Sequence, residues 1–165
     1  MLGKIAKFAD KTNEYLGNIV SVFSIIMVIM MVFSVVQRYV FQSNHIWQHE
    51  LIIFLHAAAF LTAAGYTLKK DEHVRVDVFY ERLSSKNKAF IILFGCVFLL
   101  IPVCLALLFF SFDFIANSWQ IFEKSRENDG LHGVFILKSF IWIFCITLIL
   151  QAISIIHDSL NKIKQ

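Results

Sequence analysis

The 23 residues Tyr15–Gln37, YLGNIVSVFSIIMVIMMVFSVVQ, contain no Lys, Arg, Asp or Glu. A helix that rises about 1.5 Å per residue needs about 20 apolar residues to cross a hydrocarbon core about 30 Å thick. A membrane barrel strand would need only 9–11 residues of alternating polarity, which this continuous apolar run does not show. The run is too long for the apolar part of a signal peptide, and no small-residue cleavage site follows it. We therefore predict an uncleaved transmembrane helix.

Three further stretches lack these four charged residue types and have comparable lengths. They are Leu51–Leu68, Ala89–Phe112 and Ser139–His157. The whole chain has 165 residues, of which 58% are hydrophobic and 16% charged, whereas soluble chains have about 45–50% and about 25%. We predict an all-α membrane protein in which residues 1–165 form one domain with four transmembrane helices. Lys4–Glu14, with Ile5, Phe8 and Ala9 at helical spacing, is expected to form a short interfacial helix.

Basic residues are distributed unevenly between the two sides of this four-helix topology. Eleven Lys and Arg lie in the N-terminal segment, the second connection and the C-terminal tail, against four in the first and third connections. The positive-inside rule then places both termini in the cytoplasm. The net charge of +3 is too small, and too little clustered, for a nucleic-acid-binding protein.

The predicted helices contain no Asp, Glu, Lys or Arg that could form an ion or proton path. His56 is the titratable residue deep inside one of them, and a haem ligand is one interpretation. A haem would need a second histidine at matching depth, but His157 lies about 20 Å away along the membrane normal. Ala59 and Ala63 share a face with His56 and form a strip of small residues that favours close helix packing.

The sequence contains only weak signals for a metal site or a reactive cysteine. His45 and His49 precede Glu50 at helical spacing, but three metal ligands are not assembled by this pattern. Cys96, Cys104 and Cys145 lie in apolar runs without metal or redox spacing. We expect no metal, no cofactor and no catalytic group. A polar stripe on one face of the last helix predicts hydrogen bonds between helices, or a surface that contacts solute; it comprises Thr147, Gln151, Ser154 and Asp158.

The most informative segment follows the first predicted helix. It reads R-Y-V-F at 38–41, W-Q-H-E-L at 47–51 and D-E-H-V-R-V-D at 71–77. Arg38 and Glu50 flank a short connection and could pair with each other, or Arg38 could bind a lipid phosphate. Three polar residues in the last motif alternate with valines and could contact a partner protein or lipid headgroups; they are His73, Arg75 and Asp77.

Together these motifs and the four-helix pattern resemble the small membrane subunit, of DctQ type, of tripartite ATP-independent periplasmic (TRAP) transporters. The sequence departs from the family where His49 stands beside Glu50 and where Leu83-Ser84 replaces a more usual Leu-Pro. The resemblance implies a multi-pass protein of the bacterial inner membrane. The family's large, M-type membrane subunit carries the sodium and substrate sites, and a periplasmic binding protein delivers a carboxylate or other organic acid.

The resemblance further implies a non-catalytic scaffold that braces the large subunit. It would contact phospholipid at the interface between the two subunits, and it can contact the binding protein. The alternative is a haem-binding membrane anchor of a respiratory enzyme. We expect the interface with the large subunit or lipid to include Arg38, Trp47, Glu50, His56, Ala59, Ala63, His73, Arg75 and Asp77.

Overall fold

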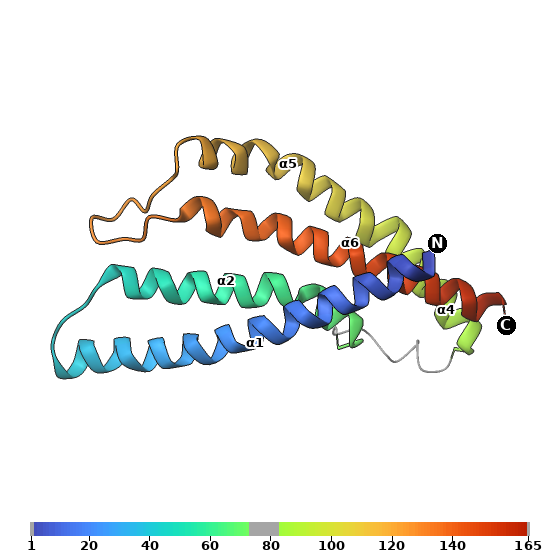
Figure 1. Cartoon of the computed structure of the whole chain (residues 1–165), viewed down its shortest axis with the longest axis horizontal. Helices are drawn as coiled ribbons and strands as arrows, with labels where there is room; N and C mark the ends of the chain where they lie inside the picture. The colour runs from blue at the N-terminus through green and yellow to red at the C-terminus, as the bar shows by residue number, and fades with distance from the viewer. Residues whose placement is uncertain (1, 73–82, 165) are drawn as a thin grey trace.

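The computed structural model describes residues 2–72 and 83–164 and is built from helices (Figure 1). The elements are α1 (Leu2–Val40), α2 (Ile46–Lys69), α4 (Ser85–Gly95), the π-helical turn η1 (Cys96–Leu100), α5 (Ile101–Gln120) and α6 (Val134–Lys164). Because α4, η1 and α5 are continuous, the described residues contain four long apolar helical segments that could each cross a membrane. The all-α fold with four transmembrane helices is confirmed.

The N-terminal segment is helical but does not form a separate interfacial helix. It is the first part of α1, which runs without a break from Leu2 to Val40. Ala6 and Ala9 are buried, and Gly3 lies beside the His157 side chain of α6. Small residues at helical spacing thus let this segment pack on α6, and the buried contact extends α1 as one rod.

Pro102 lies inside the third long segment, where it removes one backbone donor. A proline ring clashes with the carbonyl four residues earlier, which here belongs to Phe98. The structure widens this part of the helix into the π turn Cys96–Leu100, directly before the proline. The wider turn accommodates the missing backbone donor without ending the helix.

The four long helices form a slab more than a closed bundle. In Figure 1 they lie side by side in the order α1, α2, α6 and α5, and both termini are at one end. The first part of α1 also contacts α6, whereas α5 packs chiefly on α6. Burial follows this order, because 33% of the most apolar stretch of α6 is buried but only 11% of that of α1. Much apolar surface therefore remains for lipid or another chain.

Candidate partner-binding surfaces

The two ends of the slab carry different polar clusters. We call the end with both termini the terminal end, and the end with residues 41–45 and the α5–α6 loop (residues 121–133) the hairpin end. At the hairpin end, the Glu50 carboxylate of α2 accepts hydrogen bonds from the Ser125 hydroxyl and, at 2.6 Å, from the Leu131 N–H. Glu50 therefore fixes the α5–α6 loop on the start of α2.

The Arg38–Glu50 pair that the sequence suggested is not formed. Arg38 is exposed and has no hydrogen bond or ion pair within residues 2–72 and 83–164. The α1–α2 contact at this end is instead a hydrogen bond from Gln48 to Gln37. Neighbouring helical residues differ by about 100° in direction, so when Gln37 faces α2, Arg38 points to the side of α1. Arg38 is thus free to meet a lipid phosphate or a second chain.

A second carboxylate secures the other side of the α5–α6 loop. Glu123 accepts hydrogen bonds from Lys138 and, at 2.6 Å, from the Ser118 hydroxyl. The Lys138 ammonium and then the Ser118 hydroxyl lower the pKa of Glu123 below its ordinary value of 4.5. The indole N–H of Trp119 donates to Ser139 at 2.8 Å, which also ties α5 to α6. These contacts give structural roles to a loop that the sequence motifs left unexplained.

Trp47 and the predicted histidine pair lie near this loop. Trp47 is half-buried in the first turn of α2. His45 Nδ1 lies 3.4 Å from the Asp129 carboxylate, and His49 Nε2 lies 2.9 Å from the Asn44 amide oxygen. Among the described residues, no three His, Cys, Asp or Glu side chains group as metal ligands.

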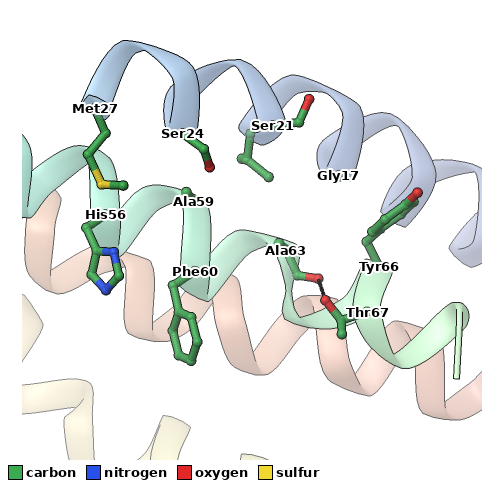
Figure 2. A pocket seen from close by; sticks show the side chains of 11 residues that line it. Gly17, Ser21, Ser24, Met27, His56, Ala59, Phe60, Ala63, Tyr66 and Thr67 are labelled. Carbon is green, nitrogen blue, oxygen red and sulfur yellow. Dashed lines mark hydrogen bonds between the residues drawn. The ribbon is translucent and has the colours of Figure 1, made fainter. Parts of the chain in front are cut away.

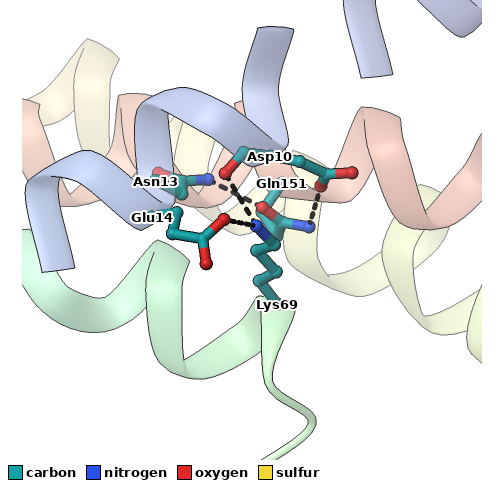
Figure 3. A network of polar contacts seen from close by, with 5 residues as sticks. All are labelled: Asp10, Asn13, Glu14, Lys69 and Gln151. Atoms are coloured by element: carbon teal, nitrogen blue, oxygen red, sulfur yellow. Dashed lines mark hydrogen bonds and ion pairs between the residues drawn. The ribbon is translucent and has the colours of Figure 1, made fainter. Parts of the chain in front are cut away.

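At the terminal end, three helices meet in the polar network shown in Figure 3. Asn13 Nδ2 donates to the Thr147 carbonyl at 3.2 Å and to Gln151 Oε1 at 2.9 Å, and Gln151 Nε2 donates to Asp10 at 2.9 Å. Lys69 reaches from α2 to Glu14 at 2.8 Å. Of the predicted stripe on the last helix, the Gln151 side chain makes hydrogen bonds to α1. The Thr147 hydroxyl instead donates to the Phe144 carbonyl within α6, at 3.0 Å.

Two glycines allow α1, α2 and α6 to approach closely at this network. A Cβ atom added to Gly65 would lie 2.6 Å from Asn13 Oδ1 and 2.8 Å from the Thr147 carbonyl oxygen. A Cβ added to Gly17 would lie 2.4 Å from the Tyr66 ring. Asn13 is completely buried, and its Oδ1 atom accepts no hydrogen bond from any residue that the structure describes. The crossing therefore depends on the absence of side chains at both glycines.

A groove of about 450 Å³ opens between α1 and α2 (Figure 2). Ala59 and Ala63 line it from α2, together with His56, while Ser21 and Ser24 line it from α1. Other small residues of α2 are buried, and they lie on the faces of the helix next to the groove; they are Ala58, Thr62, Ala64 and Gly65. The predicted Ala59–Ala63 strip therefore borders an open surface beside the closest helix contacts.

His56 is exposed in this groove, and its ring stacks on that of Phe60 at a centroid distance of 6.0 Å. It has no hydrogen bond within the part of the chain that the structure describes. His157, the other histidine considered for haem, lies beside Gly3 at the terminal end. The remaining predicted interface residues, His73, Arg75 and Asp77, lie outside the described residues.

Comparisons with known proteins agree with this architecture. The family model for the DctQ component of tripartite ATP-independent periplasmic transporters matches residues 27–161. A curated relative, the C4-dicarboxylate TRAP transporter small permease protein DctQ of Vibrio cholerae, is 26% identical over 117 residues, or 71% of this chain. The match spans 46% of the relative's own length. No solved structure matches the chain. This multi-pass inner-membrane chain belongs to the DctQ family of small TRAP transporter permease subunits.

Proposed function

We propose that this chain braces the large, M-type membrane subunit of a sodium-driven TRAP importer of carboxylates or other organic acids. The observation that carries the proposal is that the polar contacts between helices lie at the two ends of the slab. Networks of hydrogen bonds lock the helices at the terminal end and at the hairpin end. Between them the predicted spans hold no Asp, Glu, Lys or Arg. Such a chain supplies a rigid frame and leaves ion and solute binding to another subunit.

The proposal includes an orientation and two partners. With eleven basic residues against four, we place the terminal end in the cytoplasm and the hairpin end in the periplasm. The α5–α6 loop, held by Glu50 and Glu123, would then face the substrate-binding protein. The broad apolar faces of the slab would face the large subunit and phospholipid. Residues 1–165 would act as one domain.

The substrate class rests on the relative, whose name specifies C4-dicarboxylates. The haem-anchor alternative is not favoured, because the family match is to a transporter component and His56 and His157 lie at different depths. The direct test is to reconstitute this chain and the large subunit into liposomes, with the binding protein outside. Uptake of a labelled C4-dicarboxylate should require both membrane subunits and an inward sodium gradient. Uptake by this chain alone would contradict a bracing role.

A variant of Arg38 tests the predicted interface with the large subunit. Arg38→Ala should lower the yield of the large subunit that co-purifies with this chain, because the exposed guanidinium is the charge available to a second chain or a bridging lipid phosphate at the end of α1. Lys124→Ala, which removes an exposed charge from the α5–α6 loop at the same end, is the matched control. Equal yields for the two variants would show that Arg38 does not contribute to the interface with the large subunit.

A further inference from the structure

We propose that the groove between α1 and α2 receives one transmembrane helix of the large subunit, which forms hydrogen bonds with His56 and Ser24. The inference rests on the proposed bracing function and assigns a surface to it. The first argument is depth. His56 lies ten residues after the start of α2 at Ile46 and thirteen before its end at Lys69. These separations are about 15 Å and about 20 Å along the helix, so the groove lies inside the hydrocarbon core.

The second argument is the polarity of the groove. His56 and Ser24 are both exposed on the surface of this chain, and neither has a hydrogen bond to any residue that the structure describes. A polar group in hydrocarbon without a hydrogen-bond partner is unfavourable. The acyl chain of a lipid has no donor or acceptor, and headgroups do not reach this depth. A transmembrane helix can supply a polar side chain or a free carbonyl oxygen.

The third argument is shape. Ser21, Ala59 and Ala63 are small, so the groove between α1 and α2 admits a close-packed helix (Figure 2). A second copy of this chain fits less well. A two-fold interface would bring the groove against itself, and two concave surfaces leave a void between them. The occupant with the matching chemistry is therefore a different membrane chain that presents a ridge of side chains.

Photo-crosslinking of the assembled membrane complex tests the assignment. The photoreactive residue p-benzoyl-phenylalanine replaces Ser24 in the groove, and it replaces Phe109, which is 77% exposed on α5, as the control. We expect an adduct with the large subunit from position 24 and none, or far less, from position 109. An adduct with a second copy of this chain, or lipid adducts alone, would overturn the proposal. If the wild-type chain does not co-purify with the large subunit, the bracing function itself fails.

The affinity between the two purified subunits in detergent gives a second readout. His56→Leu retains bulk but cannot form a hydrogen bond, whereas His56→Gln retains a donor and an acceptor. We expect the leucine variant to bind the large subunit about threefold more weakly, which corresponds to about 0.6 kcal/mol for one hydrogen bond between helices in a membrane. The glutamine variant should recover most of the affinity. Equal affinities for wild type and His56→Leu would overturn the role of His56.

Discussion

The crossing of α1, α2 and α6 makes a sharp prediction for Gly65→Ala. The added methyl group would lie 2.6 Å from Asn13 Oδ1 and 2.8 Å from the Thr147 carbonyl oxygen. The amide of Asn13 can rotate away, but the carbonyl belongs to the backbone of α6. Either the helices separate or Asn13 loses its hydrogen bonds to Thr147 and Gln151. Both outcomes destabilise the same contact.

The size of the effect follows from three contributions. Overpacking a tight contact costs about 1–3 kcal/mol. Each of the two Asn13 hydrogen bonds contributes about 0.6 kcal/mol in a membrane, and alanine is favoured over glycine in a helix by about 1 kcal/mol. The net destabilisation is about 1–3 kcal/mol. For a chain of this length, a loss of 1 kcal/mol lowers Tm by about 2–4 °C, so Gly65→Ala should unfold about 2–12 °C earlier.

The protein carries its own reporters for this measurement. Cys104 and Cys145 are buried, with exposed fractions of 1% and 0%, so a thiol-reactive fluorescent dye labels them only as the chain unfolds in detergent. Gly95→Ala is the matched control, because a Cβ atom there meets nothing within 4 Å. Its Tm should be unchanged or higher. Equal Tm values for Gly65→Ala and Gly95→Ala would refute the close crossing.

A double variant separates the two clashes. Asn13→Ala alone removes the hydrogen bonds to Thr147 and Gln151 and should also lower Tm. In Asn13→Ala/Gly65→Ala the methyl group no longer meets the amide, so the loss should be smaller than the sum of the two single losses. Additive losses would show that the Thr147 carbonyl alone limits residue 65.

Three further predictions concern the polar ends and the groove. Glu50→Ala should release the α5–α6 loop and speed its cleavage by trypsin several-fold, whereas Glu127→Gln, at an exposed loop carboxylate, should not. The pKa of Glu123 is lowered in the folded chain, so its contact with Lys138 stabilises the fold above about pH 4.5 and is lost as the pH falls through the lowered pKa. Glu123→Gln should therefore show a smaller fall in Tm below about pH 4.5 in the thiol-dye assay. Ala63→Leu should fill the groove, leave Tm nearly unchanged and reduce co-purification of the large subunit.

The sequence was sufficient for the number and type of helices. Four runs of 18 to 24 residues without charge define four crossings, because lipid admits few other structures for such runs. The ends of the helices were harder to place. The first helix begins at Leu2, well before the predicted span at Tyr15, because α6 offers a packing surface that a sequence pattern does not contain. Burial of Ala6 and Ala9 on that surface is a tertiary effect.

The partners of individual polar residues were predicted less well. Arg38 and Glu50 are close in sequence and flank one turn, which made a pair plausible. Glu50 instead accepts a hydrogen bond from Leu131, 81 residues away, because the α5–α6 loop lies against the start of α2. The sequence prediction missed Asn13, although it is fully buried at the three-helix crossing. The available clue was its position: Asn13 lies two residues before the apolar run that begins at Tyr15, and Gln151 is a polar residue inside the last apolar run.

The distribution of buried surface supports the proposed bracing role. A chain that worked alone would bury its apolar faces in a closed bundle and leave a polar path at its centre. Here α6 is the central helix, the outer helices expose most of their apolar surface, and the polar contacts are concentrated toward the two ends. Hydrogen bonds at both ends hold the helices in fixed relative positions, so a partner that binds the slab contacts a rigid surface. The α1–α2 groove, where His56 has no hydrogen bond to a described residue, is the surface that we propose for that partner.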